Sequence, residues 1–352
     1  MRYGMIMAGG AGTRLWPMSK PEQPKQLLPL MHGRSLLEIA AARLGGIVED
    51  QHRFICTGER YRAAIRERMP DIGDDQILGE PEGRDTLNAV AYTAAVLHRQ
   101  DPDAVFAVLT ADHLITPEDE FQRKVALGFD LVEDDPHRIV TFSITPTFAA
   151  TGYGYVELGD EIDGFAPATD AKQFREKPDA ATAQSYLDAG TFGWNSGMFI
   201  FHAGSVMETV KRFRPDHYEP MLAIASAWGG NHFRDVIGAE YPKLEKISVD
   251  YAIMEPASTD DTLKVVAVPM AVQWMDVGSW PSFGETLEHD ANGNAATSAT
   301  RHIDAKNVLC VSDDPKHLIA TIGCEDLIIV RTKDATLVCA ADRAEEVKQL
   351  AE

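Results

Sequence analysis

The chain has 352 residues, of which 45% are hydrophobic and 25% are charged, an ordinary globular composition with room for two domains. Its net charge of −21 argues against nucleic acid and anionic membranes as partners, and no apolar run reaches the roughly 20 residues of a membrane span. The four cysteines are widely spaced, show no C-x-x-C pair and follow no export signal, which predicts reduced thiols and a cytoplasmic location.

Short apolar runs alternate with longer amphipathic stretches over residues 1–290, and these two patterns predict strands and helices respectively. The predicted strands are residues 3–8, 53–57, 104–110, 138–144, 197–202 and 263–269. The predicted helices are residues 35–45, 59–69, 86–99 and 117–132. Alternation of this kind predicts an α/β fold with a doubly wound, mostly parallel, Rossmann-like sheet. Ligands of such sheets bind outside the carboxyl ends of the strands.

The sequence changes in character after residue 290. Residues 290–298 are small and polar, like a linker. Four short apolar runs then follow at close intervals, at residues 307–312, 318–322, 326–331 and 335–339. They predict consecutive strands of a small β-helix-like domain, closed by a helix over residues 341–351. We therefore expect one domain of residues 1–290 and a second domain of residues 291–352.

The first predicted strand leads into a glycine-rich segment, Gly9-Gly10-Ala11-Gly12-Thr13-Arg14-Leu15-Trp16-Pro17. Glycines at a strand end let the backbone approach a phosphate, and successive N–H groups can form an anion-binding nest. The segment lacks the Lys-Ser or Lys-Thr of a Walker loop, and Leu15 replaces the third glycine of the dinucleotide fingerprint. Arg14 and Lys25 supply local positive charge. Residues 8–26 therefore predict a triphosphate site, the alternative being a tight turn with solvated basic residues.

Two aspartates follow predicted strands in distant parts of the chain. Asp112 follows the apolar run 105–109, and Asp276 follows residues 272–275. Two carboxylates at strand ends suit one Mg²⁺ with open positions for phosphate oxygens. Either residue alone could instead cap a turn or a helix. His113 invites interpretation as a general base, but a phosphate nucleophile is already an anion at neutral pH, which favours a structural role for this histidine.

Seven motifs stand in one order along the chain: the glycine-rich signature with Pro24-Lys25-Gln26, and residues 110–113, 151–155, 174–178, 195–199, 248–255 and 274–278. In this order they resemble the sugar-1-phosphate nucleotidyltransferase family. Trp16 with Pro24-Lys25-Gln26 is similar to the mannose-1-phosphate guanylyltransferase branch. The resemblance implies that residues 1–290 are the catalytic domain and that the tail is the short β-helical domain of this branch.

The resemblance also implies the roles of individual residues. The implied nucleotide-binding residues are Ala8, Gly9, Gly10, Gly12, Thr13, Arg14, Lys25, Gly83 and Arg84. The implied sugar-phosphate-binding residues are Asp112, Gly154, Glu176, Lys177 and Asn195. Asp112 and Asp276 would hold Mg²⁺. The implied catalytic residues are Arg14, Lys25, Asp112, Lys177 and Asp276. From the residues alone, Lys177 could instead form an exposed ion pair with Glu176, and Glu255, which with Asp250 lines the same region in the family, could be structural.

The implied reaction transfers a guanylyl group from GTP to α-D-mannose 1-phosphate by in-line attack on the α-phosphate, giving GDP-mannose and pyrophosphate. The family segment G-R-N-T-A-P-A reads Gly83-Arg84-Asp85-Thr86-Leu87-Asn88-Ala89 here, which leaves the base preference open. Alternatives are another sugar 1-phosphate or base, of the GDP-heptose, UDP-glucose or ADP-glucose type, and a non-catalytic regulatory homologue that senses nucleotide sugars. A dinucleotide-binding oxidoreductase is disfavoured by Leu15.

The resemblance carries an expectation for the tail as well. We expect it to pack on the catalytic domain and to support a homodimer. From a length of 352 residues we also expect no further isomerase domain of the kind found in longer bifunctional relatives.

Overall fold

The computed structural model of the chain describes residues 1–10, 12–31 and 33–351, so Ala11 of the glycine-rich segment lies outside the described residues. The chain divides into two compact units. The first consists of Met1–Gly9, Glu38–Ala111 and Ile115–Trp274, and the second of Gly10–Leu37, Asp112–Leu114 and Met275–Glu352. The second unit thus combines the glycine-rich segment and both aspartates with the tail. The domain boundary at residue 290 stays a prediction along the chain, and this spatial division cuts across it.

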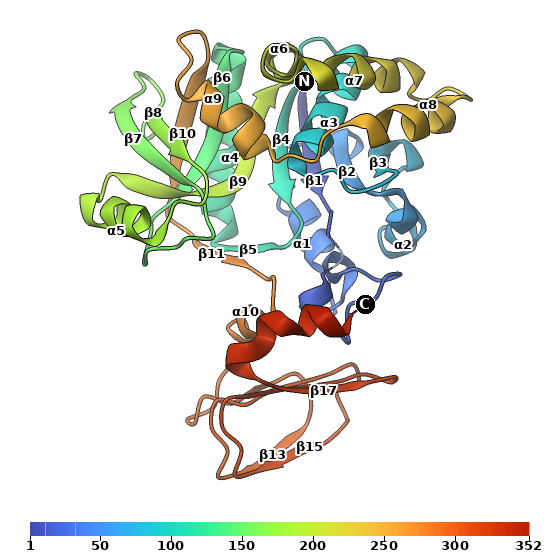
Figure 1. Cartoon of the computed structure of the whole chain (residues 1–352), viewed down its shortest axis with the longest axis vertical. Helices are drawn as coiled ribbons and strands as arrows, with labels where there is room; N and C mark the ends of the chain where they lie inside the picture. Colours follow the sequence, from blue (N-terminus) through green and yellow to red (C-terminus); the bar gives the residue numbers. More distant parts are fainter. Residues whose placement is uncertain (11, 32, 352) are drawn as a thin grey trace. The chain divides into compact units, whose positions relative to one another are not determined.

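The first unit is built on a nine-stranded sheet in the described part of the chain, with the order β3-β2-β1-β4-β9-β6-β10-β8-β7 (Figure 1). Its strands are β1 (Arg2–Met7), β2 (Arg53–Gly58), β3 (Ile77–Glu80), β4 (Val105–Thr110), β6 (Arg138–Ile144), β7 (Tyr155–Glu161), β8 (Thr169–Arg175), β9 (Phe192–His202) and β10 (Lys264–Met270). All strands point the same way except β8 and β9, which are antiparallel to their neighbours. The predicted mostly parallel sheet is therefore confirmed.

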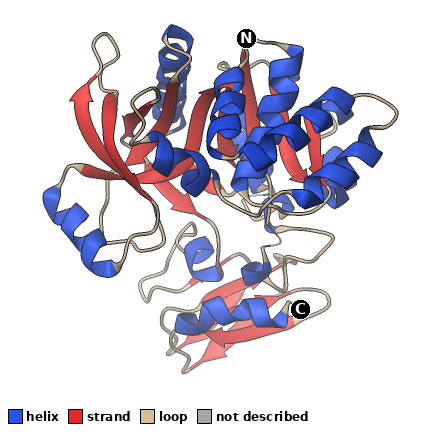
Figure 2. Ribbon diagram, turned by 45° about the horizontal axis from the view of Figure 1, so that its top comes forward, coloured by secondary structure: helices blue, strands red, loops and turns tan. Residues whose placement is uncertain are grey.

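Helices cover both faces of this sheet (Figure 2). They are α1 (Leu36–Ala42), α2 (Arg62–Arg68), α3 (Thr86–Gln100), α4 (Glu118–Asp134), α5 (Ala180–Ala189), α6 (Ala203–Phe213), α7 (Pro215–Ala227), α8 (Phe233–Glu240) and α9 (Glu255–Ala257), with a π-helical turn over Asp250–Met254. Burial on both sides explains why β1 and β4 are continuous apolar runs that could be recognised from sequence.

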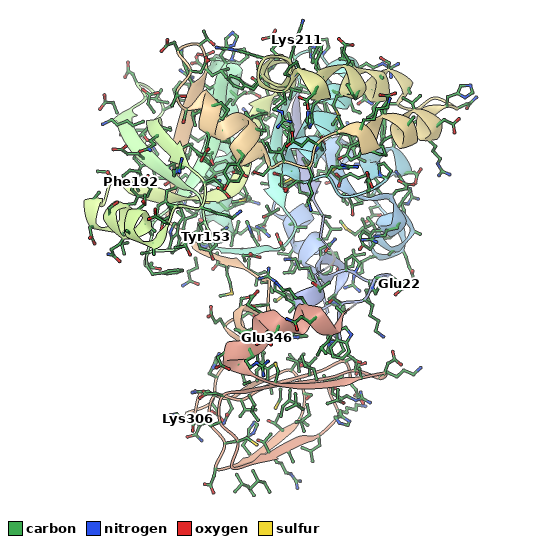
Figure 3. All side chains as sticks on the ribbon, in the orientation of Figure 1. Glu22, Tyr153, Phe192, Lys211, Lys306 and Glu346 are labelled. Carbon is green, nitrogen blue, oxygen red and sulfur yellow. The ribbon has the colours of Figure 1, made fainter. Side chains whose placement is uncertain are left out.

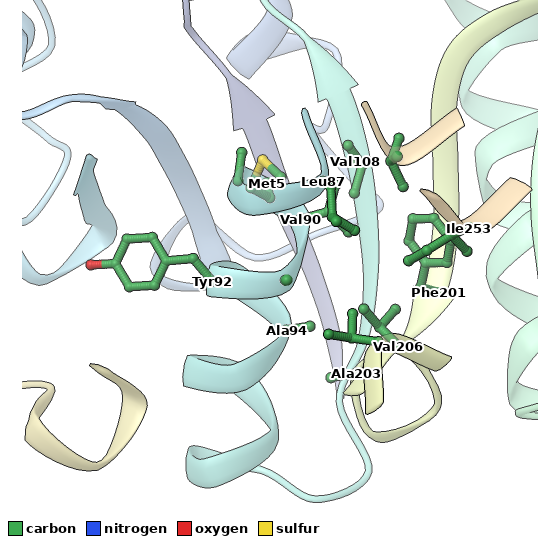
Figure 4. Close-up of a cluster of buried hydrophobic side chains, with 14 of the residues drawn as sticks. Met5, Leu87, Val90, Tyr92, Ala94, Val108, Phe201, Ala203, Val206 and Ile253 are labelled. Atoms are coloured by element: carbon green, nitrogen blue, oxygen red, sulfur yellow. The ribbon is translucent and has the colours of Figure 1, made fainter. Parts of the chain in front are cut away.

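The main core lies between the sheet and α3, α6 and α7. Figure 4 shows Leu87, Val90 and Ala94 of α3 in one buried cluster with Met5 of β1 and Val108 of β4. On the opposite face α4 approaches β9 closely. A Cβ on Gly128 of α4 would lie 2.7 Å from Cδ1 of Ile200. Because side chains alternate along a strand, Ile200 faces α4 while Phe201 joins the main core.

The six strands predicted for the first 290 residues are confirmed, and most of their ends agree with the structure to within a few residues. Strands β3, β7 and β8 of the same sheet were missed. Most positions of β8 are exposed and only Phe174 is buried, while β7 ends in exposed residues, so neither strand presents an apolar run. β9 begins five residues earlier than predicted, at Phe192 rather than at residue 197. Its alternation is interrupted by Gly197, which has a φ of +68°. Helices α5 to α8 were also not predicted.

The tail of the second unit consists of short consecutive strands, as predicted, and most of them pair in parallel. Its elements are α10 (Trp280–Gly284), β12 (Ala295–Ala296), β13 (Thr300–Ile303), β14 (Leu309–Ser312), β15 (Ile319–Ile322), β16 (Leu327–Arg331), β17 (Thr336–Ala340) and the 3₁₀ helix η8 (Ala341–Leu350). β12, β14 and β16 pair in parallel, as do β13 and β15, while β17 is antiparallel to β16. The short strands β5 (His113–Thr116) and β11 (Gln273–Asp276) form a separate pair.

The segment predicted to be a linker, residues 290–298, is an ordered part of the tail. The Asp290 carboxylate accepts hydrogen bonds from the backbone N–H groups of Asn292 and Asn294, at 2.8 and 2.9 Å. The Asn294 side chain is buried and donates to the carbonyl of Ala305. Small polar residues therefore form a hydrogen-bonded turn here rather than a flexible connection. Among the described residues, no helix has the length and apolar character needed to cross a membrane.

Candidate active site

Gly12 is the residue that lets the glycine-rich segment fold over Lys25. It has a φ of +63° and precedes the 3₁₀ helix η1 (Thr13–Leu15), and its carbonyl accepts hydrogen bonds from the N–H of Leu15 and the hydroxyl of Ser19. A Cβ at this position would lie 2.5 Å from Cβ of Lys25 and 3.0 Å from its backbone nitrogen. Both the backbone conformation and the space therefore require glycine.

At the start of the glycine-rich segment, Ala8 is held by hydrogen bonds while Gly9 and Gly10 are exposed. The Ala8 N–H donates to the carbonyl of Cys56 and its carbonyl accepts from the hydroxyl of Thr57, both at 2.8 Å. The backbone of Ala8 is therefore used by the fold. Gly9 and Gly10 are exposed, and no described atom lies within 4 Å of the position that a Cβ would take on either. These two glycines offer the open backbone that a phosphate could approach, and Thr13 is exposed as well.

Lys25 lies against the two predicted metal ligands. It belongs to the 3₁₀ helix η2 (Lys25–Leu27), and its Nζ lies 2.6 Å from Oδ2 of Asp112 and 3.8 Å from Oδ1 of Asp276. The N–H of Val277 donates to the Asp112 carbonyl at 3.0 Å, which fixes the two acidic segments beside each other. Burial alone would raise the pKa of Asp112, but the charges of Lys25 and His113 outweigh it and hold this pKa below its ordinary value.

The acidic residues fit a divalent cation. Asp112, His113 and Asp276 each offer a ligand atom, and these atoms lie within 4.8 Å of one another. Oδ1 of Asp276 is buried and makes no hydrogen bond to any described residue. A buried carboxylate oxygen without a donor is costly, and a bound cation would satisfy it. Two carboxylates with room for further oxygens are the ligands that Mg²⁺ prefers. His113 is buried, with Nε2 4.0 Å from Oδ1 of Asp112.

Arg14 has a partner that the sequence did not indicate. Its Nη1 donates to both carboxylate oxygens of Glu345 in η8, at 3.0 and 3.3 Å. The guanidinium also passes Gly278, where a Cβ would lie 3.1 Å from Nη2. Glu345 lies in the terminal helix of the tail, to which the sequence assigned no role in the site. No sequence signal marks the pair, because the two residues are far apart in the chain.

The predicted sugar-phosphate residues of the first unit form one cluster. Lys177 has a φ of +45°, and its Nζ lies 2.9 Å from Oε1 of Glu176. A Cβ on Gly154 would lie 2.4 Å from Oε2 of Glu176, so glycine leaves space for this carboxylate. The Gly154 carbonyl accepts the N–H of Asn195, whose Nδ2 donates to Oδ1 of Asp250 at 2.9 Å. Asp250, at the start of the π-helical turn, completes the cluster.

The charges in this cluster influence one another. Burial and then the neighbouring charge of Glu176 raise the pKa of Asp250 to about 7. Burial would lower the pKa of Lys177, but the hydrogen bond and charge of Glu176 outweigh it and raise this pKa. Glu255 accepts the backbone N–H of Glu176 at 2.9 Å, which supports the structural role that was left open for it. Tyr153, which is labelled in Figure 3, packs edge-on against Trp194 and Trp274.

Residues 83–89, which depart from the family pattern, are fixed by hydrogen bonds to other parts of the chain. Arg84 donates to the carboxylate of Glu82 and to the carbonyls of Pro242 and Leu244, so its guanidinium is engaged by protein acceptors. Asp85 has a φ of +68° and caps α3 through the N–H of Thr86. Asn88 donates to the carbonyls of Arg84 and Glu245. Of the two predicted nucleotide contacts here, Gly83 is exposed and open, whereas the Arg84 side chain fixes the loop.

A parallel sheet that ends in an open glycine loop, with a lysine between two carboxylates, defines a class of phosphate-handling enzymes. Comparison with known families identifies that class: the chain belongs to the nucleotidyl transferase family, whose model matches residues 3–293. The model of the mannose-phosphate isomerase and GMP-like β-helix domain matches residues 301–352. The predicted family and fold class, including the β-helix-like tail, are thereby confirmed.

Several individual proteins of known sequence or structure are similar to this chain over nearly its whole length. The chain is 37% identical over 356 residues to the xanthan biosynthesis protein XanB of Xanthomonas campestris pv. campestris, covering 98% of this chain and 72% of XanB. It is 36% identical over 357 residues to a mannose-1-phosphate guanylyltransferase of Escherichia coli K12, covering 99% and 73% of the two chains. A crystal structure from Thermus thermophilus, described as a mannose-1-phosphate geranyltransferase, superposes with a TM-score of 0.85 at 28% identity, covering 99% of this chain and 98% of that one.

Proposed function

We propose that the protein is a mannose-1-phosphate guanylyltransferase, which transfers a guanylyl group from GTP to α-D-mannose 1-phosphate and releases pyrophosphate. The observation that carries the proposal is the position of Lys25, folded under the glycine loop and 2.6 Å from Asp112. The family match supports the reaction class. Near-complete coverage of this chain by relatives that include a mannose-1-phosphate guanylyltransferase supports the two substrates.

The proposed mechanism needs no covalent intermediate. A phosphate oxygen of the sugar phosphate attacks the α-phosphorus in line, a new P–O bond forms, and the bond to the leaving pyrophosphate breaks. The attacking oxygen is already anionic, so no base has to remove a proton. Arg14 and Lys25 offset the charge of the triphosphate, and Mg²⁺ held by Asp112 and Asp276 would, when bound, neutralise further phosphate charge. Catalysis then depends mainly on positioning and electrostatic stabilisation.

The sugar phosphate is proposed to bind at the cluster around Lys177. Its exposed ammonium would neutralise the phosphate, and the exposed fraction of its side chain, 54%, leaves it accessible. Glu176 and Asn195 are buried polar groups whose positions are fixed by Lys177 and Asp250, which suits them to orient the sugar hydroxyls. Gly154 keeps the space for the Glu176 carboxylate.

A substrate panel tests the proposal. Pyrophosphate release is measured with GTP, ATP, UTP and dTTP against mannose, glucose and heptose 1-phosphates, each with and without Mg²⁺. We expect the highest kcat/KM for GTP with mannose 1-phosphate, and loss of turnover when the metal is chelated. Asp276→Asn serves as the matched inactive control. A preference for another base or sugar would replace the substrates, and a protein that binds these ligands without turnover would be a regulatory homologue.

We also propose a homodimer formed through the tail. Ile303 of β13 and Ile322 of β15 stand directly opposite each other and are 57% and 71% exposed, which is unusual for a paired apolar couple. A second copy of this face would cover them. Light scattering should give the mass of a dimer, and Ile322→Glu should give a monomer. A monomeric native protein would overturn the proposed homodimer.

The cytosol is the proposed location, since all four cysteines are free thiols.

A further inference from the structure

The glycine loop and the tail share one hydrophobic core within the second unit. Leu15 of η1 is fully buried and belongs to the same apolar cluster as Ala344 and Val347 of η8. The indole N–H of Trp280 donates to the carbonyl of Trp16 at 2.9 Å. The short helix that carries Arg14 therefore rests on the C-terminal helix, and its position depends on the tail.

The pair formed by Arg14 and Glu345 uses only part of the guanidinium. Glu345 accepts from Nη1, at 3.0 and 3.3 Å, while Nε and Nη2 of Arg14 make no hydrogen bond to the described residues. Nη2 lies where Gly278 leaves space, since a Cβ on Gly278 would be 3.1 Å from it and 3.4 Å from both carboxylate oxygens of Asp276. Of the two remaining donor groups, Nη2 therefore lies beside Gly278 and near the carboxylate of Asp276.

We propose that Glu345 is a positioning residue of the nucleotide site, which orients Arg14 so that Nε and Nη2 meet the triphosphate. This inference rests on the proposed function in so far as the ligand is a triphosphate. Arginine binds phosphate oxygens through a planar fork of fixed geometry, so the orientation of the guanidinium decides how many donors are used. Because Glu345 fixes this orientation before the ligand arrives, less conformational freedom is lost on binding. The tail is then part of the nucleotide site.

If Glu345 had a purely structural role, its substitution would lower the thermal midpoint of unfolding, whereas a positioning role predicts a different result. The side chains of Arg14 and Glu345 are 40% and 65% exposed, and exposed ion pairs add little to folding stability. Substitution of Glu345 should therefore leave the thermal midpoint of unfolding unchanged while it weakens binding of the triphosphate.

The experiment compares Glu345→Ala and Glu345→Gln with two matched controls. Glu346→Gln removes a charge from the adjacent position, which is labelled in Figure 3 and whose carboxylate pairs with Arg343. Asp334→Asn removes the carboxylate that pairs with Lys20, which forms a second ion pair between the tail and residues 8–26. The probe is inorganic tripolyphosphate with Mg²⁺, measured by calorimetry, together with kcat/KM for GTP and KM for mannose 1-phosphate.

We expect Glu345→Ala to weaken binding of tripolyphosphate and to lower kcat/KM for GTP by about three- to tenfold, the loss expected for one immobilised side chain. KM for mannose 1-phosphate should not change. Glu345→Gln, which can still accept a hydrogen bond, should recover part of the loss. Neither control should weaken binding. In an Arg14→Gln background the Glu345→Ala change should have no further effect, because the two residues act through one interaction.

Three results would overturn the inference: a wild-type protein that does not bind tripolyphosphate, a Glu345→Ala variant that binds it as tightly as wild type or more tightly, or an Asp334→Asn variant that weakens it equally. Tripolyphosphate carries neither base nor sugar. If GTP and mannose 1-phosphate fail as substrates while binding still depends on Glu345, the proposed function falls and the role of Glu345 stands. If GTP and mannose 1-phosphate react but substitution of Glu345 does not change binding, the proposed function stands and the role of Glu345 falls.

Discussion

Lys25 is a buried ammonium group placed between two carboxylates. Its side chain is 10% exposed, and its Nζ lies 2.6 Å from Oδ2 of Asp112 and 3.8 Å from Oδ1 of Asp276. A buried charge needs a partner, so in the absence of ligand the lysine and the acids neutralise one another. Bound triphosphate and a divalent cation would provide each with a new partner. The same residues can therefore serve stability without ligand and charge neutralisation with it.

Lys25→Ala should lower turnover by on the order of 10²–10³, as expected for the loss of one preorganised charge in a closed site. The measurement is kcat from pyrophosphate release with GTP and mannose 1-phosphate. Lys20→Ala is the matched control, since Lys20 lies in the same segment, is 42% exposed and pairs with Asp334 outside the acidic site. Near wild-type turnover in Lys25→Ala would contradict the assigned role.

Asp250 should make the protein less stable as pH rises. The unfolded chain releases this proton near the ordinary pKa of 3.8, whereas the folded chain holds it to about pH 7. Between these values the folded state binds more protons, so the free energy of unfolding falls with increasing pH. Asp250→Asn removes this contribution. The variant should gain stability over wild type on going from pH 4 to pH 8, by about 1–2 kcal/mol once partial exposure is allowed for.

Urea denaturation at each pH measures this difference. Asp71→Asn, at an exposed aspartate of the same unit, is the control and should follow the wild-type pH dependence. A pH-independent difference between Asp250→Asn and wild type would show that the Asp250 carboxyl titrates in the folded protein as it does in the unfolded chain.

At the scale of elements, the start of α3 is tied to the segment that precedes the π-helical turn. Arg84 and Asn88 donate to main-chain carbonyls of Pro242, Leu244 and Glu245, and the Thr86 hydroxyl accepts the N–H of Val249. These bonds fix the loop in which this chain departs from its family pattern. The departure therefore has a structural counterpart: Asp85 caps the helix and Asn88 joins two segments.

Arg84→Ala should reduce the free energy of unfolding by about 1–3 kcal/mol, because the carbonyls of Pro242 and Leu244 lose a charged donor. Amide hydrogen exchange should increase in residues 242–249. Arg66→Ala, at an exposed arginine of α2, should change stability by no more than about 0.5 kcal/mol. Unchanged exchange in residues 242–249 would mean that the other bonds suffice to hold this segment.

At the scale of the whole molecule, the tail and the glycine-rich segment are parts of one folded unit. Leu15, Leu28 and Leu36 share a buried cluster with Val330 and Leu337 of the tail. The tail is thus the surface on which the glycine-rich segment folds, in addition to being a candidate dimer surface. Loss of packing in the tail should therefore also destabilise the glycine loop.

Leu337→Ala should lower the free energy of unfolding by about 2–4 kcal/mol, since it removes a buried side chain from this shared cluster. It should also increase hydrogen exchange in residues 13–28. Val338→Ala is the matched control on the same strand, because Val338 is 60% exposed. If Leu337→Ala destabilised the tail while residues 13–28 kept their wild-type protection, the two parts would be independent.

The sequence by itself determined the features that arise from local patterns. Continuous apolar runs marked β1, β4 and β6, because strands covered on both faces contain few polar residues. The glycines, Arg14 and Lys25 indicated a phosphate site, since backbone freedom and charge are properties of the residues themselves. The motif order identified the family, and with it the candidate residues Asp112, Lys177 and Asp276. Strands β7 and β8 escaped prediction because exposed and half-buried positions leave neither of them a continuous apolar run.

Only the tertiary structure decided which of these features meet. A pattern of apolar residues shows that a face is buried but not what buries it, so the insertion of β9 between β4 and β6 could not be read from the chain. The contact of Lys25 with Asp112 and the pairing of Arg14 with Glu345 join residues far apart in sequence. Such contacts depend on the packing of whole elements. For the same reason the sequence placed a boundary at residue 290, whereas packing gathers the glycine loop and the tail into one unit.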